Sequence, residues 1–125
     1  MPEHVSISSA PAPVGPYSPV VKANGFVFLS GQVPLTPDGP RVDADVATQT
    51  EIVCHNITAI LTEVGLDWSD VVKTTIFMAD IADYATINEV YGVAVGSPAP
   101  ARSAVQVAAL PLGAKVEIEV VAQDR

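Results

Sequence analysis

The chain has 125 residues, of which 49% are hydrophobic, and it carries a formal net charge of −8 at pH 7. This length suffices for one core, so we expect residues 1–125 to form a single domain. The excess of acids, 14 Asp and Glu against 6 Lys and Arg, argues against a nucleic-acid surface, which needs clustered basic residues. Because the mean hydropathy is nonetheless +0.36, much apolar surface remains to be covered, and this favours an oligomer.

Targeting and covalent cross-linking signals are weak throughout the sequence. Residues 1–9 lack the basic region and apolar core of a signal peptide. No apolar run approaches the ~18–20 residues that a membrane span requires. Cys54 is the single cysteine, so an internal disulfide and a cysteine-based metal framework are excluded. We therefore expect a soluble cytoplasmic protein with no membrane partner.

The first regular elements expected are two strands joined by a tight turn. Residues 20–23 and 26–30 are mainly apolar and flank Asn24-Gly25, the strongest short-range signal for a two-residue hairpin. The stretch 31–40 contains three prolines, which do not fit inside a helix or a central strand. We therefore expect an ordered loop there.

A long helix is expected after this loop. Asp43 or Asp45 can cap its start, and Gly65 stands where helices commonly end. Between them one face recurs at helical spacing, and its members are Val46, Thr50, Val53, Ile57, Ile60, Leu61 and Val64.

Three more strands and a second helix are expected in the remainder. Residues 72–78 alternate and are rich in β-branched side chains, as in a half-buried strand. A helix is expected from about residue 83, with Tyr84, Ile87, Tyr91 and Val95 on one face, and the Gly-Pro-rich linker at residues 96–100 ends it. Two strands at 103–109 and 115–122 follow. The order β-β-α-β-α-β-β predicts an α+β sandwich with helices on one face of a mixed sheet.

Arg102 is the only charged residue between Glu89 and Lys115, among small and apolar neighbours. A guanidinium in such a place offers a rigid, planar fork of donors that suits a carboxylate or a phosphate. The alternative is an ion pair or stacking at a subunit contact, which is the more frequent use of arginine when position alone is considered.

Glu117 lies in a strand-like alternation in which Val116 and Ile118 form the apolar face. On this pattern alone, Glu117 and Glu119 simply belong to a solvated face. Glu117 becomes a candidate base if its strand pairs with the strand that follows Arg102, or if another subunit closes that face.

Four further residues have both a structural and a ligand-binding interpretation, namely Tyr17, Ser30, Gly31 and Asn88. Tyr17 follows a Gly-Pro pair in an apolar loop, where a packing role is the more frequent one. Gly31 would let a ligand approach the backbone closely, but it equally serves a turn. The two histidines, at positions 4 and 55, lack neighbours at ligand spacing, so no metal site is expected.

Six segments together resemble the RidA (YjgF) family of reactive-intermediate deaminases, in the family's order and spacing. They are Ala10-Pro-Ala-Pro-Val-Gly-Pro-Tyr-Ser, Phe28-Leu-Ser-Gly-Gln-Val-Pro-Leu, Val71-Val-Lys-Thr-Thr-Ile-Phe-Met, Ile87-Asn-Glu-Val-Tyr, Pro100-Ala-Arg-Ser and Val116-Glu-Ile-Glu. The resemblance implies a chorismate-mutase-like fold and a homotrimer whose sheets enclose a central barrel. It also implies three sites in clefts between the subunits.

The resemblance further implies the roles of the candidate residues. Arg102 would clamp a substrate carboxylate, and Glu117 would position the hydrolytic water. Tyr17, Ser30 and Gly31 would line the same cleft, and Asn88 would lie near it. Backbone groups near Gly31 and Ala104 would supply the remaining hydrogen bonds to the substrate. The implied reaction is hydrolysis of 2-iminobutanoate, 2-iminopropanoate or an enamine tautomer such as 2-aminoacrylate to a 2-keto acid and ammonia. No cofactor is expected, because free imines already hydrolyse in water.

The chain departs from the family's pattern at a few positions. Ala104 stands where many members carry a cysteine, so a thiol-based role is absent. Gln106 and Ala109 replace common charged residues. Three alternatives remain open: an enzyme for another pathway-specific imine, a non-catalytic protein that binds a 2-keto acid or another small carboxylate, and a ribonuclease or translation inhibitor, which the acidic surface makes the least favoured.

Overall fold

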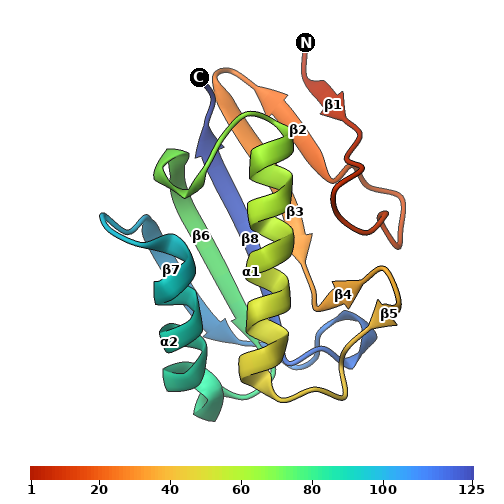
Figure 1. Ribbon diagram of the computed structural model, residues 1–125, viewed down its shortest axis with the longest axis vertical. Coiled ribbons are helices and arrows are strands. Elements are labelled where there is room, and N and C mark those ends of the chain that lie inside the picture. Colours follow the sequence, from red (N-terminus) through yellow and green to blue (C-terminus); the bar gives the residue numbers. More distant parts are fainter.

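The computed structural model describes residues 1–125 and contains a six-stranded sheet covered on one face by two helices (Figure 1). The sheet strands are β1 (Glu3–Val5), β2 (Val20–Ala23), β3 (Phe26–Gln32), β6 (Val71–Met78), β7 (Ala101–Gln106) and β8 (Val116–Gln123). A separate hairpin comprises β4 (Leu35–Thr36) and β5 (Gly39–Pro40), and the helices are α1 (Val46–Glu63) and α2 (Tyr84–Val95). Three short 3₁₀ turns, η1 (Trp68–Asp70), η2 (Ile81–Asp83) and η3 (Pro111–Gly113), complete the chain.

The spatial order of the sheet is β1-β2-β3-β8-β6-β7. All neighbouring pairs are antiparallel except β6 and β7, which are parallel. The helix α2 makes the crossover between these two parallel strands (Figure 1). The prediction of an α+β fold with two helices on a mixed sheet is confirmed.

The hairpin and the long helix form for the reasons that the sequence suggested. Asn24 and Gly25 have φ angles of 52° and 83°, the left-handed values that a two-residue hairpin turn requires. Asp45, rather than Asp43, caps α1 by accepting a hydrogen bond from the amide of Thr48 at 2.8 Å. Gly65, with φ 79°, follows the last turn of α1.

The core lies between the helices and the sheet. Helix α1 contributes Val53, Ile57, Ile60 and Leu61, all at most 1% exposed. Burial of each such side chain stabilises the fold by roughly 1.5–3 kcal/mol. Every second residue of β8, and of β6 from Thr74 onwards, joins this layer, as expected for strands with one buried face. Neither helix combines the length and apolar character that a bilayer crossing demands.

Several boundaries differ from the sequence-based expectation. Strand β7 begins at Ala101 rather than 103 and ends at Gln106 rather than 109, because its ladder with β6 starts at the Lys73–Ala101 pair. Arg102 is therefore inside a strand. Strand β1 and the β4–β5 hairpin were not expected, since they are too short to show a periodic pattern and the hairpin is rich in proline.

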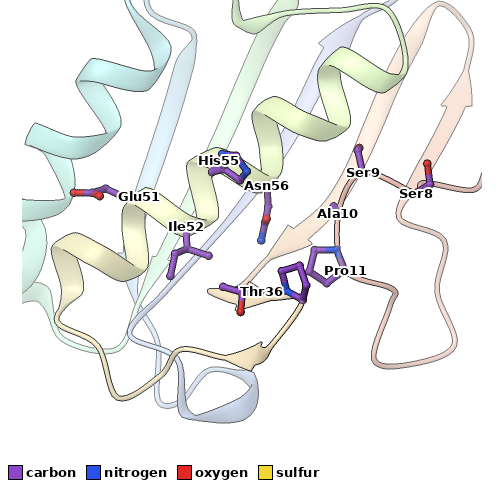
Figure 2. Close-up of a pocket in the computed structure, with 10 residues that line it drawn as sticks. Ser8, Ser9, Ala10, Pro11, Thr36, Glu51, Ile52, His55 and Asn56 are labelled. Carbon is purple, nitrogen blue, oxygen red and sulfur yellow. The ribbon is translucent and has the colours of Figure 1, made fainter.

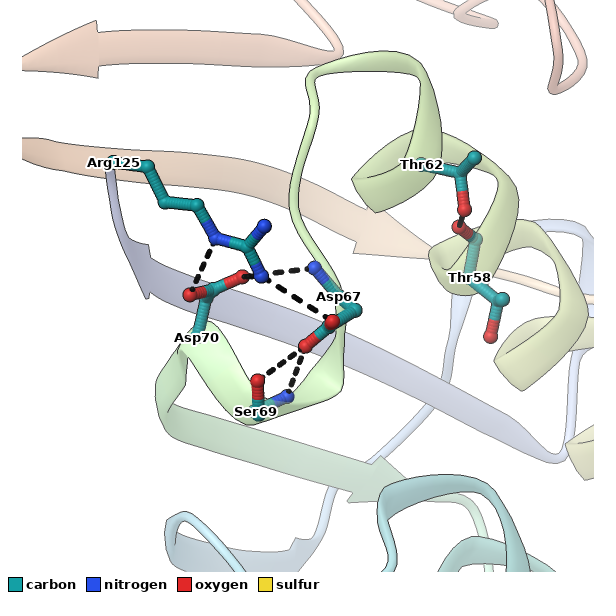
Figure 3. Close-up of polar contacts among 6 residues, drawn as sticks. All are labelled: Thr58, Thr62, Asp67, Ser69, Asp70 and Arg125. Carbon is teal, nitrogen blue, oxygen red and sulfur yellow. Dashed lines mark hydrogen bonds and ion pairs between the residues drawn. The ribbon is translucent and has the colours of Figure 1, made fainter.

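The C-terminal residue ties the end of β8 to the turn between α1 and β6. Arg125 Nη2 lies 3.3 Å from an Asp67 carboxylate oxygen and 2.8 Å from one of Asp70 (Figure 3). Asp67 also accepts hydrogen bonds from the amide and the hydroxyl of Ser69. The two termini lie at the same end of the molecule (Figure 1).

The N-terminal segment runs along the outside of α1. The amides of Ser8 and Ser9 donate hydrogen bonds to the Glu63 carboxylate at 2.7–3.0 Å, and the Ser9 hydroxyl donates to the Ala59 carbonyl at 3.1 Å. A cavity of about 730 Å³ separates this segment from β4 and the middle of α1 (Figure 2).

Candidate functional site

Four of the residues singled out from the sequence line one pocket of about 350 Å³. Tyr17 comes from the loop between β1 and β2, Ser30 and Gly31 from β3, and Glu117 from β8. The rest of the lining is Val14, Val33, Pro111 and Glu119, which pattern reasoning did not identify. Ser30 and Glu117 are 87 positions apart in the sequence, and they line the same pocket because β3 and β8 are neighbours in the sheet.

A bulge in β3 shapes this pocket. Leu29 pairs with Val120 and Gln32 pairs with Ile118, so Ser30 and Gly31 together stand opposite one residue of β8. Such an extra residue bends the strand and re-aims the neighbouring side chains. The Ser30 hydroxyl donates to the Ser18 carbonyl at 2.6 Å, which fixes the loop that carries Tyr17.

Glycine at position 31 makes room for the Glu117 carboxylate. A Cβ atom on residue 31 would lie 2.6 Å from Glu117 Oε2 and 2.9 Å from its Cδ, far inside normal contact distance. In one copy of the chain, the atoms nearest to Gly31 are thus those of the Glu117 side chain on the neighbouring strand, and approach of a ligand to the Gly31 backbone stays a prediction.

Glu117 is half-buried and electrostatically unpaired. Burial raises the pKa of this carboxyl above its ordinary value of 4.5, and the charge of Glu119 raises it further. The carboxylate takes part in none of the four ion pairs of the chain. A partly dry, unpaired carboxylate beside a pocket suits the transfer of a proton to or from a bound molecule.

Arg102 also lacks an acidic partner, and aromatic side chains hold it instead. Its Nη2 donates a hydrogen bond to the Tyr84 hydroxyl at 2.9 Å. Its Cζ lies 5.5 Å from the centroid of the Tyr84 ring and 5.2 Å from that of the Tyr91 ring. No ion pair in the chain involves this guanidinium, so its charge remains available to an anion.

The second helix supplies the surroundings of Arg102. Tyr84, Asn88 and Tyr91 are spaced i, i+4 and i+7 on α2, which places them on one face. Ala104 follows Arg102 by two residues on β7, shares its face of the sheet, and packs against the core. We had assigned Tyr84 and Tyr91 only to an apolar helix face, and nothing in their spacing showed that they contact Arg102.

Arg102 and Glu117 point to opposite faces of the sheet. In the ladders, Arg102 aligns with Thr74 on β6 and Thr74 aligns with Val120 on β8, in the layer under the helices. Glu117 aligns with Phe77, which belongs to the other, helix-free face. The strands of Arg102 and Glu117 do not pair, because β6 lies between them, so the first of the two conditions stated for Glu117 is not met. In one copy of the chain, the guanidinium and the carboxylate do not line the same pocket.

The helix-free face of the sheet exposes large apolar side chains. They are Phe26, Phe28, Val72 and Val105, each between 40% and 44% exposed. Several exposed apolar side chains on one face of a sheet favour an interaction surface there.

The larger cavity between the N-terminal segment and α1 contains none of the residues singled out from the sequence (Figure 2). Its titratable residues are Glu51 and His55. No group of three or more His, Cys, Asp or Glu side chains in the chain is arranged to hold a metal ion.

Comparisons with known proteins identify close relatives. The endoribonuclease L-PSP family model matches residues 7–124. The chain is 54% identical over 121 residues to the chloroplastic Reactive Intermediate Deaminase A of Arabidopsis thaliana, covering 96% of this chain and 65% of that protein. It is 43% identical over 119 residues to the 2-iminobutanoate/2-iminopropanoate deaminase of Mus musculus, covering 94% and 88%. The structure of E. coli TdcF with bound serine has a TM-score of 0.87 at 40% identity, covering 97% of this chain and 99% of that one.

Proposed function

We propose that this chain, which belongs to the endoribonuclease L-PSP (YjgF/RidA) family, is a hydrolytic deaminase of 2-imino acids. Its substrates are 2-iminopropanoate, 2-iminobutanoate and their enamine tautomers, and its products are a 2-keto acid and ammonia. The relatives at 54% and 43% identity are named as deaminases of this kind. The observation that carries the proposal is one guanidinium and one half-buried carboxylate, neither of which has an ionic partner in the chain.

Arg102 binds the substrate carboxylate in this proposal. The planar fork of a guanidinium accepts a carboxylate bidentately, and this fixes the imine carbon, which is bonded to the carboxylate, relative to the protein. Asn88 lies on the same helix face as the tyrosines that hold Arg102 and contacts the bound substrate. The backbone near Ala104 supplies a further hydrogen bond.

Glu117 orients the water molecule and transfers protons in this proposal. The carboxylate orients a water molecule and takes one proton as the water oxygen adds to the imine carbon. The same proton then passes to the nitrogen, which gives a carbinolamine. The carboxylate next takes the proton of the new hydroxyl group and delivers it to the nitrogen, so that the C–N bond breaks as the C=O bond forms and ammonia leaves. Tyr17, Ser30 and the Gly31 backbone line this half of the site. The balance requires only the substrate and water, so no cofactor enters.

A complete site requires two copies of the chain. Because Arg102 and Glu117 of one copy point to opposite faces of the sheet, the Arg102 half of one subunit must meet the Glu117 half of a neighbour. The exposed apolar face supports burial between copies, and a homotrimer with the sheets around a central barrel provides three such sites. A mass measurement by light scattering should give a trimer.

Mixing two inactive variants tests the shared site directly. Arg102→Ala and Glu117→Ala subunits, each inactive alone, are unfolded, combined in equal amounts and refolded together. Random assembly then pairs an intact Arg102 with an intact Glu117 at about a quarter of the interfaces, so about a quarter of the wild-type activity should return. If the mixture stays inactive while Arg102→Ala refolded with wild type regains activity, both residues act within one copy.

The activity itself is tested by ammonia release from 2-iminopropanoate generated in situ. Wild type should accelerate release over a no-protein control, Arg102→Ala should not, and Arg102→Lys should be intermediate because lysine lacks the bidentate fork. Absence of acceleration by wild type contradicts the proposal. A cytoplasmic location, near enzymes that release enamines, is part of this proposal.

Two alternatives compete with this proposal. A solved structure with a bound small molecule favours the first, and only the description of the family model favours the second. A protein that binds small carboxylates without turnover would use Arg102 alone, and the bound serine of E. coli TdcF is a small molecule with a carboxylate. It would show tight 2-keto acid binding and no ammonia release. An endoribonuclease activity, which the description of the family model names, disagrees with the net charge of −8. Further purification should remove any ribonuclease activity while it retains ammonia release.

A further inference from the structure

The guanidinium of Arg102 is held by neutral partners. Two tyrosines of α2 contact it: the Tyr84 hydroxyl accepts its Nη2 hydrogen bond at 2.9 Å, and the rings of Tyr84 and Tyr91 lie 5.5 and 5.2 Å from its Cζ. A carboxylate partner would have neutralised the charge that a substrate needs. Phenol groups orient the side chain without cancelling that charge.

Tyr91 is itself rigidly anchored. Its hydroxyl shares a buried hydrogen bond of 2.7 Å with the Thr74 hydroxyl, and Trp68 packs edge-on against its ring at a centroid distance of 6.3 Å. Thr74 stands directly beside Arg102 in the ladder between β6 and β7. Tyr91 therefore presents a rigid ring to the guanidinium. The ring is held by α2, on which Tyr91 lies, and by Thr74 on β6, the strand next to Arg102.

Tyr84, unlike Tyr91, is exposed to solvent. It lies at the start of α2, directly after η2, and is 41% exposed, so burial does not explain why a tyrosine stands there. Its hydroxyl takes one of the five N–H donors of the guanidinium and leaves the others without a partner in the chain. This single bond fixes rotation of the planar group about its own axis.

We propose that Tyr84 and Tyr91 are positioning residues that set the plane of the Arg102 guanidinium before a carboxylate arrives. Tyr91 supports one face of the group, and Tyr84 fixes its rotation. Loss of the Tyr84 hydroxyl frees the guanidinium, and a substrate carboxylate must then order it. The cost falls on binding, so KM and Kd change while kcat does not. The inference rests on the proposed function for the identity of the substrate, but its binding test does not require turnover.

The experiment compares two readouts on the same variants. The first is the Kd of pyruvate, the 2-keto acid related to 2-iminopropanoate, by calorimetry, and the second is kcat and KM for ammonia release. Tyr84→Phe should weaken pyruvate binding and raise KM about fivefold, the usual effect of one hydrogen bond. Tyr84→Leu, which also removes the ring, should do so about 10–30-fold. In both variants kcat should stay within about twofold of wild type.

Controls separate positioning from a structural role. Val93→Ala changes a side chain of the same helix that is 87% exposed, and it should leave both readouts unchanged. Tyr91→Phe alone would leave the buried Thr74 hydroxyl without its hydrogen-bond partner. Tyr91→Phe is therefore made together with Thr74→Val in the same chain. In an Arg102→Ala background, Tyr84→Phe should have no further effect on the residual affinity, because its action passes through the arginine.

The outcomes distinguish this inference from the proposed function. If wild type binds pyruvate and both Tyr84 variants bind it equally well, the positioning role is wrong while deaminase activity stands. If wild type binds pyruvate but releases no ammonia, the deaminase proposal fails and the Tyr84 series still decides the positioning role through Kd. A kcat loss with unchanged KM in Tyr84→Phe also contradicts the inference.

Discussion

Gly31 and Glu117 approach each other so closely that a methyl group on residue 31 would lie 2.6 Å from Glu117 Oε2. The contact joins the bulge of β3 to the strand that carries the candidate base. The position of the Glu117 carboxylate thus depends on the absence of a side chain at residue 31 of the neighbouring strand β3.

Replacement of Gly31 by alanine should displace the Glu117 carboxylate. Because the added Cβ atom overlaps the carboxylate group, either the side chain of Glu117 rotates away or the bulge shifts. In the proposed mechanism both changes misplace the water that Glu117 orients. We expect kcat to fall by about 100-fold, as for other misplaced catalytic groups, while KM changes little. Steady-state ammonia release measures both.

A double variant shows whether the clash is the cause. In the Glu117→Ala background there is no carboxylate to displace, so adding Gly31→Ala should lower the melting temperature much less than it does in the wild-type background. If Gly31→Ala lowers the melting temperature equally in both backgrounds, backbone strain in the bulge is the cause instead.

The activity should depend on pH through Glu117. Glu117 must be ionised to accept a proton, and burial raises the pKa of this carboxyl above 4.5, with Glu119 as a second cause. The acid limb of kcat/KM should therefore lie above pH 4.5, and Glu119→Gln should move it to lower pH. The substrate imine also titrates, so the ratio of the variant to wild type at each pH is the useful measurement. An unchanged ratio across the limb would contradict this prediction.

The same shift has a consequence for stability, with a definite sign. A carboxyl whose pKa is higher in the folded than in the unfolded protein binds more protons when folded. Its contribution is thus most favourable below the unfolded pKa and is lost as the pH rises through the folded pKa. Glu117→Gln should melt at a higher temperature than wild type at pH 7, and the difference should vanish below about pH 4. A variant that is less stable at pH 7 would show that the ionised carboxylate has a stabilising partner.

The sequence predicted the long elements because each has a strong local signal. Asn24-Gly25, the Asp45 cap and the alternation of β6 from Thr74 to Met78 recur in the structure at the expected places, whereas a register shift between Val71 and Lys73 leaves Val72 exposed. Cys54, next to Val53 of the buried face of the long helix, is 4% exposed, and burial raises the pKa of its thiol to about 12. These features depend on neighbouring residues in the chain, which a sequence displays directly.

The site was less predictable because it depends on which strands become neighbours. No local pattern shows that β6 separates β7 from β8, so the separation of Arg102 and Glu117 on two faces could not be read from the sequence. Gly31 also had two interpretations until the register of β3 and β8 put it against Glu117. Tyr84 was assigned to an apolar face, since helical spacing does not reveal a contact with a strand residue.

The C-terminal ion pairs should make a small, salt-dependent contribution to stability. Arg125 pairs with Asp67 and Asp70 on the surface (Figure 3), and such exposed pairs are weakened by solvent and by salt. Arg125→Ala should lower the melting temperature by about 1–4 °C at low ionic strength, and the difference should nearly disappear in 1 M NaCl. Arg41→Ala is the matched control, because its only pair, with Asp43, spans 4.0 Å between exposed groups. A loss that persists in salt would indicate packing by the Arg125 side chain rather than charge.

The N-terminal segment should detach locally when Glu63 loses its charge. Hydrogen bonds from Ser9 and Ser8 hold the pKa of this carboxyl below its ordinary value of 4.5. A lowered pKa means that the stabilisation is present above the unfolded value and is lost as the pH falls through the folded one. In Glu63→Gln we expect the amides of Ser8 and Ser9 to exchange hydrogen about tenfold faster at neutral pH, with the sheet amides unchanged.

Glu51→Gln provides the comparison for Glu63→Gln. Glu51 is an exposed acid on the same helix that lines the cavity beside the N-terminal segment, and none of the side-chain contacts of Ser8 or Ser9 involves it. Its neutralisation removes the same charge without touching the two amides, so their exchange should stay at the wild-type rate. Equal acceleration in both variants would mean that the net charge of α1, rather than the Glu63 hydrogen bonds, holds the segment in place.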